Sequence, residues 1–268
     1  MSKIIAFANQ KGGVGKTTSC INISSALALM GKKVLIVDVD PQGNATSGVG
    51  IKKSPDLKSI YNAIVGEVSV DSVIQKTAID NLDILPASID LAGVEVEMVY
   101  MENREHVLKK ILTACKNSYD YITIDCPPSL GLLTINALTS SDSVLIPIQC
   151  EFFALEGLSQ LMNTVRLVKK RLNPQLTIEG VLLTMRDSRS SLGHQVTEEI
   201  KKYFANTVYE NSIPRNVRLA ESPSHGLPIF LYDKSCSGAK AYLKVAEELL
   251  TRCKDSYKTI TLPTRRPK

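Results

Sequence analysis

The turn near the N-terminus constrains this chain more than any other stretch. An apolar run over residues 3–8 predicts a strand, and an apolar-periodic segment over 16–30 predicts a helix. Between them the sequence reads Lys11-Gly12-Gly13-Val14-Gly15-Lys16-Thr17-Thr18. Glycines let backbone N–H groups surround phosphate oxygens, Lys16 can reach the β and γ phosphates, and the Thr17 hydroxyl can bind Mg²⁺. This loop therefore predicts a cradle for nucleotide phosphates.

The loop departs from the ordinary Walker pattern at two positions. Gln10 stands where that pattern has glycine, and Lys11 is a lysine that the pattern does not require. A chance glycine-rich turn is the alternative, but a turn that follows a strand, opens a helix and ends in Lys-Thr favours nucleotide binding.

Apolar runs of strand length alternate with helical stretches along the chain. Further strands are expected at 34–37, 82–85, 121–124, 144–148 and 178–183, and the clearest helices at 93–116, 155–172, 195–204 and 238–253. This alternation predicts an α/β fold, a doubly wound and mostly parallel sheet with helices on both faces. No linker interrupts it, so residues 1–253 are expected to form one domain and 254–268 a flexible tail.

Carboxylates follow two of the expected strands. Asp38 and Asp40 end the strand at 34–37, and Asp125 ends the strand at 121–124. Strand ends of a parallel sheet converge on one edge, so these side chains should meet the phosphate loop. One of the first two carboxylates could organise Mg²⁺ and the other could orient a water, and Asp125 has the Walker B position that holds Mg²⁺ through water.

The positive charge lies in the second half of the chain. The net charge of +5 divides into 13 basic and 14 acidic residues over 1–134, and 19 basic and 13 acidic over 135–268, where nine of the ten arginines lie. Arginine suits phosphate recognition. The absence of Trp and the 5% content of aromatic residues argue against stacking of single-stranded bases.

Four stretches together resemble the ParA-type (Soj-like) partitioning ATPases, which have the deviant Walker A loop. They are Asn9 to Thr18, Asp38-Val39-Asp40-Pro41-Gln42-Gly43-Asn44, Asp125-Cys126-Pro127-Pro128-Ser129-Leu130-Gly131, and Ile213-Pro214-Arg215-Asn216-Val217-Arg218. The resemblance covers about residues 1–252. It implies a P-loop ATPase that uses ATP and Mg²⁺ and forms an ATP-sandwich homodimer.

The resemblance also implies roles for individual residues. Lys11 is the signature lysine that reaches the partner subunit's nucleotide, and Asp40 positions the attacking water, so Lys11, Lys16 and Asp40 form the catalytic set. Pro214 and Asn216 lie near the adenine, alongside the phosphate loop from Lys11 to Thr18. Thr17 and Asp125 hold Mg²⁺, and Asp38 is the third candidate ligand.

Arginines of two expected loops in the basic second half of the chain are candidates for DNA binding. The resemblance implicates Arg189 and Arg218 in sequence-independent binding of double-stranded DNA by the ATP-bound dimer, whereas an isolated surface arginine would be only a solvated charge. It further implies slow turnover stimulated by a ParB-type protein, and a role in partitioning chromosome or plasmid DNA.

Three alternatives share the loop. A MinD-like membrane ATPase would end in a basic amphipathic helix, but residues 259–263 alternate and end in Pro263. An iron–sulfur reductase needs a cysteine pair at a dimer axis, which Cys126 alone does not supply. A small-molecule ligase would need a metabolite for turnover and would be indifferent to DNA.

The sequence shows no export or membrane segment. Residues 1–8 lack a signal peptide's apolar core, and no run approaches the ~18 apolar residues of a membrane span, so a cytoplasmic, nucleoid-associated protein is expected.

Overall fold

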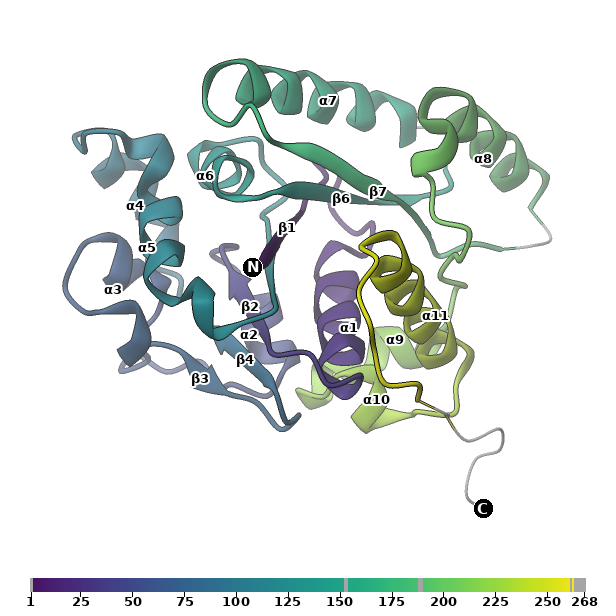
Figure 1. The fold of residues 1–268 in the computed structure, drawn as a ribbon, viewed down its shortest axis with the longest axis horizontal. Helices are drawn as coiled ribbons and strands as arrows, with labels where there is room; N and C mark the ends of the chain where they lie inside the picture. The colour runs from purple at the N-terminus through teal and green to yellow at the C-terminus, as the bar shows by residue number, and fades with distance from the viewer. Residues whose placement is uncertain (1, 152–153, 188–189, 261, 263–268) are drawn as a thin grey trace.

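The chain folds around one seven-stranded sheet (Figure 1). A computed structural model describes residues 2–151, 154–187, 190–260 and 262. The strand order is β3-β4-β2-β5-β1-β6-β7. The strands are β1 Lys3–Phe7, β2 Val34–Asp38, β3 Gln75–Lys76, β4 Leu82–Leu85, β5 Tyr121–Asp125, β6 Ser143–Gln149 and β7 Thr177–Thr184. Every pairing is parallel except the one between the edge strand β3 and β4, which confirms the predicted doubly wound fold.

Burial on both faces explains why the strands read as continuous apolar runs. All five residues of β2 and of β5 are buried, because helices cover both sides of the sheet. The register sets Asp38 of β2 beside Asp125 of β5, and Phe7 of β1 on the other side of Asp125. The carboxyl ends of the three central strands are therefore level, as the sequence predicted.

Two layers of helices enclose the sheet (Figure 1). Helices α5, α6 and α7 pack on one face, while α1 and α11 pack on the other. The helices are α1 Lys16–Leu29, α2 Asn44–Gly48, α3 Ile60–Ile64, α4 Leu91–Met98, α5 Val107–Cys115, α6 Leu132–Ser140, α7 Ala154–Arg171, α8 Ser191–Phe204, α9 Val217–Glu221, α10 Ile229–Tyr232 and α11 Ser237–Arg252. Short 3₁₀ turns are η1 Val70–Ser72, η2 Arg104–His106, η3 Lys116–Ser118, η4 Ala205–Thr207 and η5 Ser222–His225.

The single helix expected over 93–116 is wrong. The chain forms α4, turns through η2, and then forms α5 and η3. Asn103, which has a φ of 53°, lies between the two helices in the left-handed region and reverses the chain direction. Apolar periodicity continued through this turn because both helices bury one face against the same core.

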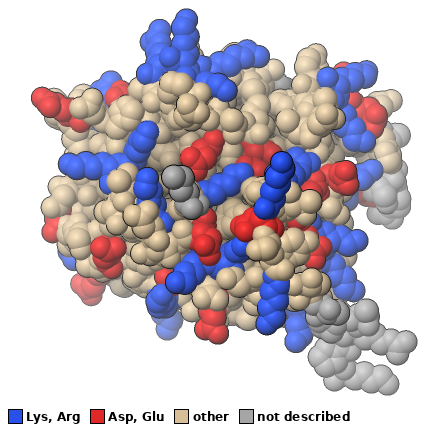
Figure 2. Space-filling view, viewed as in Figure 1, with Lys and Arg blue, Asp and Glu red and all other residues tan. Residues whose placement is uncertain are grey.

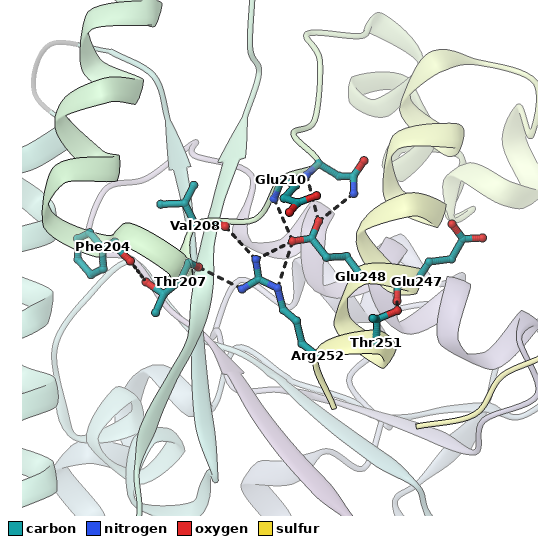
Figure 3. Close-up of polar contacts among 9 residues, drawn as sticks. Phe204, Thr207, Val208, Glu210, Glu247, Glu248, Thr251 and Arg252 are labelled. Atoms are coloured by element: carbon teal, nitrogen blue, oxygen red, sulfur yellow. Dashed lines mark hydrogen bonds and ion pairs between the residues drawn. The ribbon is translucent and has the colours of Figure 1, made fainter. Parts of the chain in front are cut away.

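A charged clamp at the end of α11 holds the segment that follows α8 (Figure 3). Arg252 donates to the backbone oxygens of Thr207 at 3.4 Å and Val208 at 2.8 Å, and its guanidinium lies 4.2 Å from the ring centroid of Tyr209. Glu248 pairs with Arg252 at 2.6 Å and accepts the backbone N–H groups of residues 210 and 211. The clamp fixes the start of the segment that leads to Pro214 and Asn216.

Within the part of the chain that the structure describes, no helix is both long and apolar enough to cross a bilayer. Residues 255–260 of the expected tail form no helix. Asp255 is bonded to Lys32 at 2.7 Å and to the Tyr121 hydroxyl at 2.9 Å, so the first part of the tail is attached to the sheet and to the end of α1. The remaining tail positions, 261 and 263–268, lie outside the described residues.

Candidate functional site

The phosphate loop connects β1 to α1 and adopts a conformation that needs glycine at two points. Gly13 has a φ of +73° and Gly15 a φ of +83°, and Gly15 caps the N-terminus of α1. The Thr184 hydroxyl, from the end of β7, donates to the backbone oxygen of Val14 at 2.8 Å. This buried bond ties the loop to the far side of the sheet and fixes the direction of its backbone.

Asn9 and Lys16 fix the first half of the loop. The Asn9 side-chain amide donates to the Pro147 oxygen at 2.7 Å and its oxygen accepts the Lys11 N–H at 3.0 Å. The Lys16 ammonium donates to the Lys11 backbone oxygen at 3.1 Å. Burial lowers the pKa of Lys16, and the carboxylates of Asp125 and Asp40 oppose this shift. The ammonium is thus held where the loop encloses it.

The Lys11 side chain points out of this arrangement. Its ammonium lies 3.0 Å from a Glu151 carboxylate oxygen, and the two side chains are 34% and 48% exposed. An exposed pair of this kind contributes little stability, about 0–1 kcal/mol. Lys11 is therefore free to exchange this carboxylate for another anion.

Two adjoining hollows lie over the loop. The first, of about 600 Å³, is lined by glycines and hydroxyls of the loop together with Lys16, Asp40, Pro128 and Ser224. The second, of about 400 Å³, is mostly apolar and is lined by Thr184, Met185 and residues 213–217, 219 and 220, which include Pro214 and Asn216. Gly15 and Thr18 line both hollows. A polar hollow for phosphates beside an apolar hollow for a base fits a purine nucleotide.

Asp38 and Asp40 differ in their surroundings. Asp38 is fully buried and accepts hydrogen bonds from the Thr46 N–H at 2.8 Å, the Thr46 hydroxyl at 2.7 Å and the Asp40 N–H at 3.2 Å. Burial raises the pKa of Asp38 to about 6. The Asp40 carboxylate accepts the Gln42 N–H at 2.9 Å and no other hydrogen bond from the described residues, and it faces the phosphate hollow. Asp38 orders the turn after β2, and Asp40 is the carboxylate presented to a ligand.

Asp125 is the buried group that needs a ligand. Both of its carboxylate oxygens are buried without a hydrogen-bond partner in the described part of the chain. Burial, and secondly the charge of Asp38, raise the pKa of Asp125 well above its ordinary value, and the nearby Thr17 side chain opposes this rise without completing a hydrogen bond of good geometry. A buried carboxylate without donors is costly unless a cation or its water satisfies it. Asp125, beside the loop that carries Thr17, therefore fits Mg²⁺ and its waters.

The basic loops meet close to the base hollow. Arg186 pairs with Pro214 in an isolated bridge, and the Arg215 N–H donates to the Arg186 oxygen at 3.3 Å. Arg215 is exposed, whereas Arg218 pairs with Glu221 at 2.8 Å and lies 3.7 Å from Asp233. Arg189 lies outside the described residues.

Sequence reasoning missed several residues of the site. Thr184 and Met185 lie at the carboxyl end of β7, so the strand-end rule that selected the aspartates could have found them. Met185 has a φ of 48° and lines both hollows. Glu151 gave no local signal, because its contact with Lys11 spans 140 residues of sequence. Asn9 belongs to the stretch that resembles the family, but its bond to Pro147, 138 residues away, could not be predicted.

Comparisons with known proteins agree with this geometry. A sequence model of the family described as AAA domain matches residues 2–178. The chain is 61% identical over 249 residues to the sporulation initiation inhibitor protein Soj of Bacillus subtilis, covering 93% of this chain and 98% of that protein. It is 52% identical over 252 residues to the chromosome partitioning protein ParA of Myxococcus xanthus, covering 94% and 89%.

A solved structure resembles the chain over its whole length. Cobyrinic acid a,c-diamide synthase from Mycobacterium smegmatis, with bound ADP and magnesium, superimposes with a TM-score of 0.84 at 35% identity, covering 100% of both chains. That protein therefore combines this fold with the ligands that the two hollows and Asp125 fit.

Proposed function

Because this chain belongs to the ParA family of chromosome-partitioning ATPases, we propose that it is a switch whose ATP-bound dimer binds DNA without sequence preference and moves DNA with a ParB-type partner. The chain is a P-loop ATPase that uses ATP and Mg²⁺. Residues 1–253 form its single ATPase domain in this proposal. It acts in the cytoplasm on the nucleoid, and no membrane is involved.

Residues of the phosphate loop and of the strand ends have different roles in the proposed hydrolysis. The loop N–H groups and Lys16 bind the phosphates, Thr17 and Asp125 hold Mg²⁺, and Asp40 orients the attacking water. Mg²⁺ supplies positive charge to the β and γ phosphate oxygens. Asp38, already bonded to Thr46, contributes to the metal site by ordering the turn that carries Asp40.

The exposed signature lysine supports an ATP-sandwich dimer. The Lys11 side chain is partly exposed, and among the described residues its one ion pair is with Glu151, so it can turn toward a nucleotide bound by a second subunit. A lysine supplied in trans makes stabilisation of the transition state depend on dimerisation. Turnover then stays slow until the dimer and its partner complete the site.

One segment of the chain connects the nucleotide site to the arginines proposed to bind DNA. The segment from Pro214 to Ser224 lines the base hollow with most of its residues up to Ala220 and the phosphate hollow with Pro223 and Ser224. Arg215 lines the base hollow itself, and Arg218 lies between its lining residues Val217 and Leu219. A nucleotide that fills both hollows therefore touches the segment on either side of its arginines, and can change how they are presented.

Co-sedimentation with an arbitrary DNA duplex under ATP, ADP and no nucleotide tests the proposal. We expect ATP-dependent binding, retained in Asp40→Ala and lost in the double variant Arg189→Glu with Arg218→Glu while basal ATPase activity stays intact. Unchanged binding by the double variant at moderate salt would refute the DNA surface. Indifference to DNA together with metabolite-dependent turnover would instead indicate a small-molecule synthase.

A further inference from the structure

Helix α4 and the turns on either side of it present an apolar stripe to solvent, which we call the exposed face of α4. Four of the ten exposed large hydrophobic side chains of the described residues lie between 89 and 100, namely Ile89, Val96, Val99 and Tyr100, with exposures of 66%, 69%, 53% and 87%. The opposite face of the same helix, Leu91, Val94 and Met98, is buried. The fold of this chain accounts for the buried face, but it does not account for the exposed hydrophobic side chains of Val96 and of the flanking turns.

The stripe has the spacing of a helix-packing surface. Ile89, Gly93, Val96 and Tyr100 follow one another at intervals of four, three and four, and backbone bonds from residue 91 to 88 and from 100 to 97 continue the helical turns beyond α4. A side chain built at Gly93 would meet nothing within 4 Å, so the middle of the stripe is open. This pattern suits an incoming helix laid along α4.

The charged residues around the stripe are acidic and favour a positively charged binding partner. Residues 90–102 contain four acidic residues, Asp90, Glu95, Glu97 and Glu102, and no lysine or arginine, although the whole chain has a net charge of +5. Figure 2 shows acidic side chains at the upper left, with basic ones beside them, and a larger group of basic side chains along the top, over α7. The nearby cation Lys53 is bonded to the Gln42 oxygen. Such a surface repels DNA and attracts a basic segment.

Two contacts join this surface to the catalytic loops. A groove of about 570 Å³ is lined on one side by residues 87–90, at the start of α4, and on the other by Pro41, Gln42 and Gly43, which follow Asp40. On α4 itself, Glu95 accepts the Leu133 N–H at 3.1 Å, at the start of α6. The loop that connects Asp125 to α6 contributes Pro128 to the phosphate hollow.

We propose that the exposed face of α4 docks a basic amphipathic helix of the ParB-type partner, and that this contact accelerates hydrolysis through the Asp40 and Asp125 loops. The inference rests on the proposed function for the existence of that partner. The apolar stripe supplies the affinity, the acidic rim supplies the preference for positive charge, and the groove and Glu95 carry the effect to the site. DNA binds elsewhere, at the Arg215 and Arg218 loop, so both partners can bind together.

A pair of matched surface variants tests the docking face. The first is Val96→Lys with Tyr100→Ala, and its control is Leu167→Lys with Tyr203→Ala, which changes side chains that are 55% and 75% exposed on α7 and α8. Binding of the full-length ParB-type protein from the same organism and ATPase rates are measured for each. We expect the α4 variant to bind at least tenfold more weakly and lose stimulation, with unchanged basal ATPase activity and ATP-dependent dimerisation, and the control to behave like the wild type.

The results separate this inference from the proposed function. If the wild-type chain binds no ParB-type protein, the partitioning role fails and the docking face fails with it. If the wild type binds and the α4 variant binds equally well, or the control loses binding instead, only the docking face is refuted. Loss of dimerisation in the α4 variant without partner would assign the stripe to a second copy of this chain, which also overturns the proposal.

Discussion

In the proposed mechanism, hydrolysis depends most directly on Asp40. Its carboxylate faces the phosphate hollow, unlike that of Asp38, which three hydrogen bonds retain in the turn. Asp40→Ala should therefore keep ATP affinity within a few-fold and lower the rate of hydrolysis by about 10²-fold or more. Isothermal titration and single-turnover phosphate release measure the two quantities, and normal turnover in this variant would contradict the assignment.

A substitution at Gly12 tests whether the subunits form the proposed ATP-sandwich dimer. Gly13 and Gly15 have positive φ values, but Gly12 does not, and a Cβ at Gly12 would meet no atom within 4 Å. The monomer therefore gives no reason for glycine at this position. We expect Gly12→Val to fold and bind ATP normally yet fail to form the ATP-dependent dimer, because the valine would contact the second subunit. Sedimentation with ATP decides, and a dimer there would count against the sandwich arrangement.

The motif residues could be predicted from the sequence because their functions depend on neighbours along the chain. Spacing predicted that Lys16, Asp38, Asp40 and Asp125 lie near one edge of the sheet, since strand ends of a parallel sheet converge, whereas the choice of Asp40 over Asp38 came from the family resemblance. The bond from Thr184 to Val14 spans 170 residues and the pair of Lys11 with Glu151 spans 140, so no local pattern could reveal them.

At the scale of elements, the strands were predicted well and one helix poorly. Runs buried on both faces are apolar throughout, so 34–37, 82–85 and 121–124 agree closely with β2, β4 and β5. The break inside 93–116 depends on one left-handed residue, Asn103, and the two-residue edge strand β3 is too short to leave a pattern.

The clamp at the end of α11 gives a prediction about stability. Arg252 bonds two backbone oxygens and Glu248, and Glu248 holds the next two N–H groups (Figure 3). Arg252→Met should lower the free energy of unfolding by about 1–3 kcal/mol, because it leaves the part-buried Glu248 carboxylate without its cation. Urea denaturation measures the loss. Lys240→Met, on the same helix with no ion pair among the described residues, is the control and should change stability little.

An ion pair within α9 is expected to compete with DNA binding by Arg218. Glu221 accepts from Arg218 at 2.8 Å and from the Tyr232 hydroxyl at 3.0 Å, so the arginine must leave this carboxylate to meet a phosphate. Water screens this exposed pair, so releasing Arg218 from it is a small effect, and Glu221→Gln should tighten ATP-dependent DNA binding by about two- to fivefold. Gel shifts measure the affinity. The same substitution in an Arg218→Gln background should have no effect, and an equal gain there would show that only the general charge matters.

At the scale of the whole molecule, the arrangement of charge matters more than its total. The net charge of +5 is small, but the arginine-rich half brings Arg186, Arg215 and Arg218 to adjoining loops, while the exposed face of α4 carries only acidic charges. One end of the molecule thus suits phosphates and another suits a basic protein segment. A dimer presents each of these surfaces twice.

The salt dependence of DNA binding shows whether one or two subunits contact the DNA. The logarithm of DNA affinity falls with the logarithm of salt concentration by about 0.9 for each phosphate contact. Arg215 is exposed and forms no ion pair among the described residues, so Arg215→Gln should remove one contact from each subunit. If the ATP-bound dimer grips DNA with both subunits, the slope should become shallower by about 1.8, whereas a bound monomer would lose only about 0.9. Titrations in the Asp40→Ala background, where ATP persists, measure the slope, and an unchanged slope would remove Arg215 from the DNA surface.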